Sequence, residues 1–439
     1  MKKHIKRILS GMFLATMLFS LSGCSNEKKG SVYYLNFKPE VADIWEEIAD
    51  LYEEETGVEV KILTAANGTY RQALKSEIAK RDMPTLFQSN GPIGYLDWKK
   101  YCEDLSDTDL HSWLLDKSLA ITDGDSVYGI PYVVEGYGII YNEEIMQRYF
   151  SLPNKSVEIN STSEINNYDI LKKVVEDMTL HKQELGIDGV FASTSFGAGE
   201  SWRWQNHLPT VSINQEFKDK KVNDLNEIDF TYANNLKNIF DLYINNSCTD
   251  KSNLASKTVN DSMEEFALGK VAMVQNGNWA WSQISSIEGN IVSSDKVKYL
   301  PIYTGIQGEE SQGLCIGTEN YFHINSKAPK ADKKATIDFL EWLFSSEKGK
   351  DYITNKFGFI SPFETFDEDE RPEDPLANEV YNYMEREDLQ SVSWISSYPD
   401  NVFREKFGQS LLGYVKGTRD WQLVVDEFKS EWKSEKSKE

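Results

Sequence analysis

Two hydrophobic periods alternate along the first hundred residues. Residues 31–37 are dense in β-forming side chains and residues 58–64 alternate between apolar and polar positions, so each stretch predicts a strand. Between them, from Val41 to Tyr52, apolar residues recur at spacings of three and four, as on one face of a helix, and Gly57 is a natural helix stop. The alternation continues with a helix, a strand and a helix over 69–82, 84–90 and 94–105. This order predicts an α/β fold with a largely parallel sheet and helices on both faces.

Further along, the apolar stretch from Tyr128 to Tyr141 is interrupted by Pro131, Gly136 and Gly138. Such breaks suit a segment that leaves one domain and enters another, and residues 313–325 form a second glycine-flanked apolar segment. A chain of 439 residues exceeds a single core, which suggests two lobes. Additional helices are expected over 167–186, 231–246, 261–270, 331–358, 401–417 and 420–439, and a strand over 271–277.

The N-terminal residues have the pattern of a secretory signal. A basic start containing Lys2 and Arg7 is followed by an apolar run too short for a good membrane span. The run ends in Leu-Ser-Gly-Cys at Cys24, the pattern of a bacterial lipobox. We therefore expect residues 1–23 to be a lipoprotein signal peptide and Cys24 to be lipidated, with residues 24–30 as a polar tether. The alternative is an ordinary signal peptide with an incidental cysteine.

The charge balance and the cysteines exclude several classes of protein. With 47 basic and 70 acidic residues the chain has a net charge of −23, which argues against nucleic-acid binding and against adsorption to anionic lipid. Cys102, Cys248 and Cys315 form no CxxC pair, and no histidine lies at zinc-ligand spacing from them. We expect no metal, no cofactor and at most one disulfide.

Recognisable catalytic motifs are missing from the sequence. It contains no HExxH, GxSxG or P-loop pattern, and no GxGxxG follows a predicted strand. Glu135 is the one acid with apolar residues on both sides. It has three possible roles: a catalytic acid, a hydrogen-bond acceptor for a ligand, or a charge at a strand end turned outward.

Aromatic residues recur where predicted strands end, as with Phe37, Tyr70, Tyr137 and Trp279. Amides and charged groups lie between them, among them Asn36, Lys38, Asn90 and Asn278. In open α/β sheets ligands bind outside the carboxyl ends of strands. Sugar rings stack on indole or phenol faces while their hydroxyls bind amides and carboxylates. The alternative for each aromatic residue is packing at the core edge. The pattern favours Trp279 as a sugar platform and, if the chain stays extended, Trp281 as core.

Four segments together resemble the extracellular solute-binding proteins of ABC importers, the group that includes maltose-binding protein. They are an opening strand–helix–strand at 32–62 and the motif "GIPYVVEGYGIIYNEEI" at 129–145. The other two are a helix and strand with the motif "NGNW", within 264–284, and a helix pair followed by a Gly/Pro-flanked strand, within 324–363. The resemblance covers nearly all of residues 31–439. It implies a periplasmic-binding-protein-like fold of two α/β domains, with a ligand cleft between them and several hinge crossings.

The resemblance also implies the extent of each lobe and a set of ligand-binding residues. The N-terminal lobe would comprise 31–133 and 319–361, and the C-terminal lobe 137–313 and 365–439. Lys38 and Glu135 would reach sugar hydroxyls, Trp279 would be the stacking indole, and Asn90 stands where the family commonly has a charged contact. The full expected set is Asn36, Phe37, Lys38, Tyr70, Asn90, Glu135, Tyr137, Trp202, Trp204, Asn278, Trp279, Trp394, Tyr398 and Arg404.

The function implied is capture of a carbohydrate, expected to be an oligosaccharide, by hinge closure and its delivery to ABC permease subunits. The protein would be a monomer attached to the outside of the cell membrane by its lipid alone, with no catalytic step. A first alternative is a lipoprotein glycoside hydrolase, which needs a second carboxylate opposite Glu135. A second is a binding protein for a polyamine, an anion or iron. A surface adhesin is disfavoured because the chain has no repeats.

Overall fold

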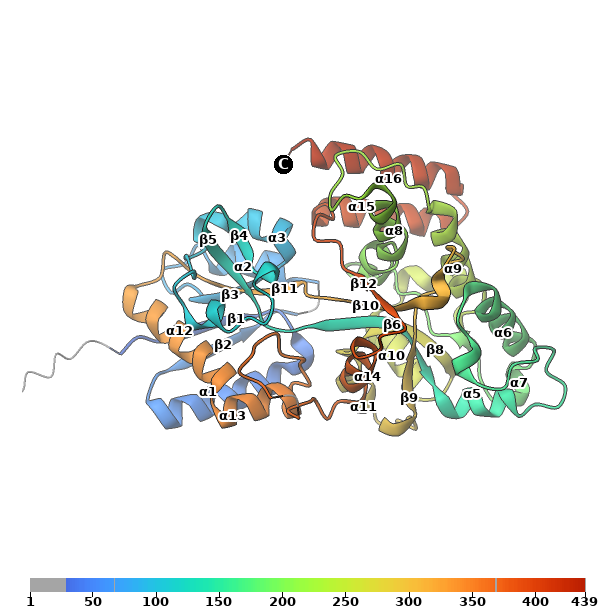
Figure 1. Cartoon of the computed structure of the whole chain (residues 1–439), viewed down its shortest axis with the longest axis horizontal. Helices are drawn as coiled ribbons and strands as arrows, with labels where there is room; N and C mark the ends of the chain where they lie inside the picture. Colours follow the sequence, from blue (N-terminus) through green and yellow to red (C-terminus); the bar gives the residue numbers. More distant parts are fainter. Residues whose placement is uncertain (1–28, 67, 368, 439) are drawn as a thin grey trace, which may run out of the picture.

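The computed structural model describes residues 29–66, 68–367 and 369–438. The predicted signal peptide and the lipidation of Cys24 lie outside the described residues. The elements form two lobes side by side, each built on a six-stranded sheet (Figure 1). The two-lobed α/β fold predicted from the sequence is confirmed. Within the described part of the chain, no helix has the length and apolar character needed to cross a bilayer.

The sheet of the first lobe is mixed. Its order is β2-β1-β3-β11-β5-β4, with β1 parallel to β2 and β3 and with β11 antiparallel to β3 and β5. The expectation of a largely parallel sheet therefore holds for two of its five pairings and is wrong for three: β11 enters from the second lobe and runs back between β3 and β5, and β4 and β5 form an antiparallel pair. The strands are β1 (Val32–Asn36), β2 (Val60–Thr64), β3 (Leu86–Asn90), β4 (Ile121–Asp123), β5 (Ser126–Pro131) and β11 (Asn320–Ile324).

Helices cover both faces of this sheet, as predicted. On one face α1 and α12 bury Trp45, Ile48 and Phe339 beside Tyr34 of β1, and on the other α2 contributes Leu74 to a cluster with Phe87. The apolar stripe predicted from Val41 to Tyr52 is thus the buried side of α1. The helix ends at Gly57, whose φ of 66° suits a residue without a side chain. The helices of this lobe are α1 (Ala42–Thr56), α2 (Tyr70–Glu77), α3 (Gly91–Trp98), α4 (Asp109–Ser112), α12 (Lys330–Ser345) and α13 (Glu347–Asp351).

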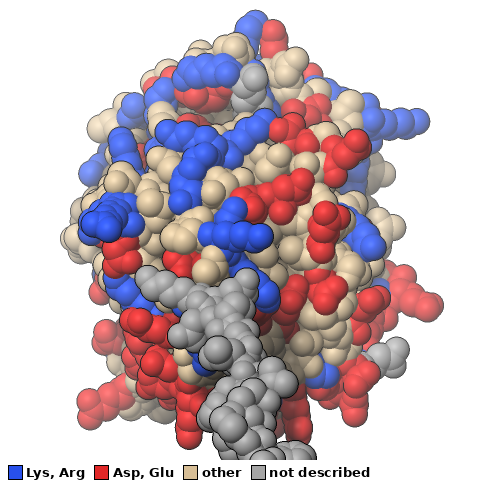
Figure 2. All heavy atoms as spheres, turned by 90° about the vertical axis from the view of Figure 1, so that its left-hand side faces the viewer, with Lys and Arg blue, Asp and Glu red and all other residues tan. Residues whose placement is uncertain are grey.

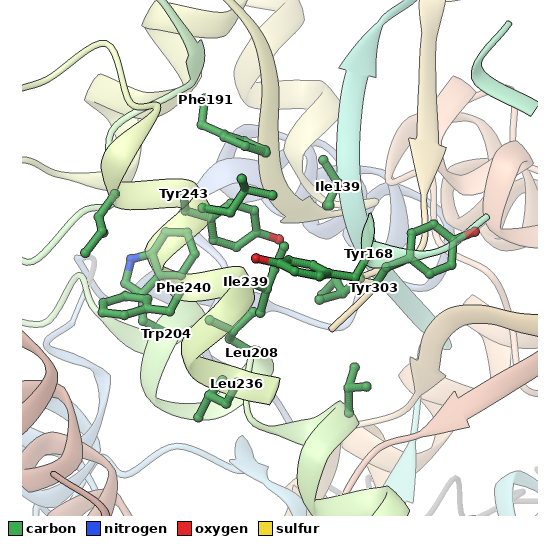
Figure 3. Close-up of a cluster of buried hydrophobic side chains, with 14 of the residues drawn as sticks. Ile139, Tyr168, Phe191, Trp204, Leu208, Leu236, Ile239, Phe240, Tyr243 and Tyr303 are labelled. Atoms are coloured by element: carbon green, nitrogen blue, oxygen red, sulfur yellow. The ribbon is translucent and has the colours of Figure 1, made fainter. Parts of the chain in front are cut away.

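In the second lobe, β6 is the central strand and is antiparallel to β8, β9 and β10. All its residues are buried. Its two faces pack on separate apolar clusters, one containing Ile139 and the other Ile140. Figure 3 shows part of the first cluster, where the rings of Phe191, Trp204 and Tyr243 come together. The strands are β6 (Glu135–Asn142), β7 (Gly189–Phe191), β8 (Val271–Gly277), β9 (Val297–Leu300), β10 (Gln312–Gly317) and β12 (Gln390–Ser393).

The helices of the second lobe surround this sheet. In Figure 1 the last two helices of the chain, α15 and α16, lie together above α8 and α9, and α14 lies below the sheet. The helices are α5 (Glu143–Phe150), α6 (Tyr168–Leu180), α7 (Lys182–Leu185), α8 (Thr210–Lys220), α9 (Ala233–Asn245), α10 (Val259–Ala267), α11 (Ala280–Ser285), α14 (Pro375–Met384), α15 (Asn401–Val415) and α16 (Trp421–Lys436).

The chain passes between the two sheets where the sequence pattern breaks. One passage joins β5 to β6, and a second joins β10 to β11. The two passages lie next to each other, because Gly317 of β10 pairs with Glu135 of β6. A bridge between Val134 and Ile360 adds a later segment of the chain at the same place.

The acidic surplus is not spread evenly over the surface. Figure 2 shows the outer end of the first lobe, where Lys and Arg side chains gather across the middle of the face and Asp and Glu along its lower and right-hand edges. The net charge of −23 therefore does not describe every face of the molecule.

Candidate ligand-binding cleft

A cavity of about 1190 Å³ lies where the two lobes meet. Residues at the ends of strands line it from both sides: Lys38 follows β1, Asn90 ends β3, Glu135 begins β6 and Trp279 follows β8. This is the edge at which open α/β sheets bind ligands. The volume is above the range of about 300–1,000 Å³ that is usual for small-molecule sites.

Nine of the fourteen predicted residues line the cavity and so lie around one space. They are Phe37, Lys38, Tyr70, Asn90, Glu135, Trp202, Trp279, Trp394 and Arg404.

Two predicted amides do not line the cavity but hold its walls. The side chain of Asn36 accepts a hydrogen bond from the Lys38 amide at 2.9 Å and donates one to the Lys38 carbonyl at 2.8 Å. Asn278 accepts from the backbone N–H of Gly136 at 3.1 Å. Both groups of the Asn36 amide and the side-chain oxygen of Asn278 thus bind loop backbone, and neither residue lines the cavity.

Three predicted aromatic residues are in the core instead. Tyr137 stacks on His207 with ring centres 4.3 Å apart, and Trp204 donates to the carbonyl of Ser195 among the rings of Figure 3. Tyr398 is 1% exposed and donates to the carbonyl of Gln205. The polar atom of each ring bonds to a buried carbonyl, which is how a core accommodates a tyrosine or tryptophan. In this structure these three residues pack in the core of the second lobe and do not line the cavity.

The motif "NGNW" turns the chain out of its strand. After Gly277 the backbone enters α11 within two residues, and the indole of Trp279 folds back over Gly277. A Cβ on Gly277 would lie 2.2 Å from that ring, so only glycine leaves room for it. Because the chain is helical here, the alternation used to place Trp281 does not apply. Trp281 nevertheless packs, half-buried, against the core, as expected.

A π-helical turn places the rings of Trp202 and His207 at the cavity. The turn covers Arg203–His207, and the guanidinium of Arg203 pins it to the second sheet by donating to the carbonyl of Gln275 at 2.8 Å. Trp202 just before the turn lies 6.0 Å from Trp279, ring centre to ring centre. Such irregular turns are frequent at functional sites.

His207 lies among these rings, with its ring centre 5.6 Å from that of Trp279 and 5.9 Å from that of Trp394. Burial lowers the pKa of His207 to about 4, so the imidazole is neutral at pH 7. Across the cavity, Phe37 and Tyr70 form an edge-to-face pair at 5.2 Å. Aromatic surface therefore faces the cavity from both lobes.

A buried ion pair joins the lobes at the base of the cleft. The ammonium of Lys38 lies 2.6 Å from one carboxylate oxygen of Glu135, and the side-chain amide of Asn320 donates to the other at 2.6 Å. Lys38 and Glu135 are only 5% and 3% exposed. Burial raises the pKa of Glu135, against the attraction of Lys38. Both carboxylate oxygens of Glu135 are engaged, so the charge predicted as a possible outward-facing group is instead a bridge between segments.

Glu319 has a central place that sequence reasoning missed. It lies on the second passage between the lobes and accepts from Arg404 at 2.9 Å and from the amide of Asn206 at 3.2 Å. It links α15 and the π-helical turn to the hinge. The only signal in the sequence was its position directly after a glycine-flanked apolar segment, in "GTEN".

The sequence matches a family of solute-binding proteins, and the fold is similar to solved structures of sugar-binding proteins. A family model described as Bacterial extracellular solute-binding protein matches residues 47–379. The fold is similar to that of RafE in complex with raffinose, with a TM-score of 0.68 and 19% identity over 92% of this chain and 99% of that chain. It is also similar to a chitin oligosaccharide binding protein, with a TM-score of 0.71 and 16% identity over 93% of this chain and 100% of that one. A third similar structure is maltose-bound MalE3 of T. maritima, with a TM-score of 0.69 and 14% identity over 92% of this chain and 99% of that chain.

Proposed function

This chain belongs to the family of bacterial extracellular solute-binding proteins, and we propose that it captures an oligosaccharide in the cleft between its lobes and delivers it to an ABC importer. The observation that carries the proposal is the pair of aromatic walls. Trp202, Trp279 and Trp394 face the cavity from the second lobe, and Phe37 and Tyr70 from the first. Indole and phenol faces are the surfaces on which the apolar side of a sugar ring stacks.

The size of the cavity favours an oligosaccharide over a single sugar. At about 1190 Å³ it exceeds the range of about 300–1,000 Å³ typical of small-molecule sites. The similar structures described above hold raffinose or maltose, or are named for binding chitin oligosaccharides, which is in keeping with a ligand of several rings.

Closure of the lobes is the proposed mechanism of capture. A ligand that touches Tyr70 of the first lobe and Trp279 of the second gains both sets of contacts only when the cleft is shut. It therefore binds the closed state more tightly and shifts the population towards it. The Lys38–Glu135 pair, held by Asn320, would orient the hydroxyls, and no step requires bond breaking.

The remaining features of the proposal concern the whole chain. The lobes would comprise 31–133 with 319–361, and 137–313 with 365–439. The protein would act as a monomer outside the cytoplasm, anchored through lipid on Cys24 and docking on permease subunits. Metabolic labelling with an alkynyl fatty acid tests the anchor, because label should be lost in a Cys24→Ala variant.

Isothermal titration calorimetry of the purified chain lacking residues 1–23 against a panel of oligosaccharides tests the proposed function. We expect stoichiometric heat with at least one sugar and an unchanged sugar on chromatography afterwards. Shortened products would support the glycoside hydrolase instead. Absence of heat with every sugar, together with binding of a polyamine or a metal ion, would overturn the carbohydrate assignment.

A further inference from the structure

Every basic side chain that lines the cleft is already paired with a carboxylate. Lys38 is held by Glu135 at 2.6 Å and Arg404 by Glu319 at 2.9 Å. The remaining pairs, Arg71 with Asp97, Lys406 with Glu431 and Arg419 with Glu427, lie towards the rim. An anionic group entering the cleft would have to displace one of these carboxylates from its partner.

The lining also carries more negative than positive charge. Of the described residues that line the cavity, nine have acidic side chains and five have basic ones, an excess of four acids. Among the described residues, Glu200, Asp400 and Glu405 have no basic side chain within ion-pair distance, although all three line the cavity. Glu200 and Asp400 accept hydrogen bonds only from backbone N–H groups, of Val259 and Phe403. Both therefore lie at helix N-termini, of α10 and α15, where the helix dipole offsets part of their charge, and the buried guanidinium of Arg203 also attracts Glu200. Glu405 is exposed to solvent. The net charge of the lining is negative because acids outnumber bases.

The hydrogen-bonding groups that are still unused are uncharged. Gln205, Gln283 and Trp394 line the cavity, and each has one buried polar atom without a partner among the described residues: the side-chain oxygens of the two glutamines and the indole N–H of Trp394. Gln205 is 7% exposed. Buried polar groups are normally hydrogen-bonded, so we expect each of these atoms to take a water or a ligand hydroxyl as its partner. Two acceptors and one donor suit hydroxyl groups, which both donate and accept.

From these observations, and resting on the proposed function, we infer that the cleft takes an uncharged oligosaccharide and rejects saccharides that carry carboxylate or sulfate. The neutral amide and indole groups bind hydroxyls. The unpaired carboxylates repel an anionic ring, and no free cation is present among the described lining residues to compensate for that repulsion.

The test uses calorimetry with two sets of probes. The neutral set is raffinose, stachyose, maltotriose, chitotriose and xylotetraose, and the acidic set is trigalacturonate and xylotriose carrying a 4-O-methylglucuronate. We expect at least one neutral sugar to bind, and every acidic sugar to bind at least tenfold more weakly than the tightest neutral one. Because the repulsion is electrostatic, raising the salt concentration from 20 to 300 mM should reduce the difference in affinity between the tightest neutral sugar and any acidic sugar that binds measurably.

A charge-neutral variant separates charge from shape. The double variant Glu200→Gln/Glu405→Gln keeps the size of both side chains. It should strengthen binding of the acidic probes at least threefold relative to binding of the tightest neutral sugar. Glu158→Gln, at an exposed position that does not line the cavity, is the matched control and should leave the ratio unchanged.

The outcomes distinguish the two proposals. Acidic and neutral sugars bound equally well, or an acidic sugar bound alone, would overturn the inferred selectivity and leave oligosaccharide capture standing. If the ratio of neutral to acidic sugar affinity is the same in the double variant as in the parent protein, the rejection is due to shape and the electrostatic argument is overturned. If no saccharide of either set binds, the proposed function fails and the selectivity with it.

Discussion

Truncation of Trp279 to alanine is the most direct test of the aromatic wall. Trp279 directly precedes α11, and its indole lies against Gly277. The ring centre is 6.0 Å from that of Trp202 and 5.6 Å from that of His207. Alanine removes the whole platform. Trp202 and His207 cannot move in to replace it, because the anchored π-helical turn holds them.

The magnitude follows from the contact that is lost. Stacked aromatic contacts contribute about 0.5–1.5 kcal/mol beyond the burial of apolar area, and that burial contributes about 0.8 kcal/mol for each methylene-sized group. We therefore expect Trp279→Ala to weaken binding by about 1–3 kcal/mol, which is roughly a 5- to 150-fold rise in Kd.

Calorimetry with the tightest-binding sugar of the neutral panel measures this change. Trp281→Ala is the matched control, since it makes the same substitution two residues on, at an indole that packs against the core and does not line the cavity. The control should lower the Tm but leave Kd within about twofold. If Trp279→Ala binds every sugar as tightly as the parent protein, the indole is not a platform and the reasoning from the aromatic walls is refuted.

Three further predictions follow from other parts of the structure. Glu135→Gln leaves the buried ammonium of Lys38 with only the more distant carboxylate of Glu40, at 3.7 Å. We therefore expect a loss of about 3 kcal/mol in unfolding free energy by urea titration, with part of it regained in Lys38→Met/Glu135→Gln; a single variant as stable as the parent protein would contradict this. Gly277→Ala forces the indole of Trp279 aside, so sugar affinity should fall by about 1–3 kcal/mol while the circular dichroism spectrum is retained; unchanged Kd would mean that the ring can shift without loss. Burial lowers the pKa of His323 from 6.5 to about 4, so between these pH values the unfolded chain binds a proton that the folded chain does not, and stability falls as the pH falls. The loss of unfolding free energy from this residue is up to about 3 kcal/mol at pH 4. His323→Gln should therefore flatten the decline in unfolding free energy measured by urea titration from pH 7 to 4. An equally steep decline in both proteins would argue against a neutral buried imidazole.

Much of the secondary structure could be predicted because hydrophobic period is a local property. The stripe from Val41 to Tyr52 became the buried side of α1, and the apolar run ending at Gly277 became β8. The break at Pro131 and Gly136 correctly indicated a passage between lobes. The direction of β11 was not accessible in this way, because it depends on which strand lies beside it after more than two hundred intervening residues.

Nine of the fourteen predicted site residues line one cavity, and the other five do not for a reason that the sequence does not contain. Trp202 and Trp204 are two residues apart, yet the first lines the cavity and the second is buried against Phe240. Trp202 directly precedes the π-helical turn and Trp204 lies within it, and no period in the sequence indicated that turn. Glu319 was missed because its importance comes from Arg404, 85 residues away in the chain.

The sequence by itself determined the order of strands and helices, the two-lobed class and the chemical character of the ligand surface, since these depend on residue type and on neighbours within a few positions. Only the tertiary structure decided which rings face the cleft and which carboxylates are neutralised by a cation. Both depend on the path of the backbone beyond each strand end and on partners brought together from distant segments, as with Lys38 and Glu135, 97 positions apart.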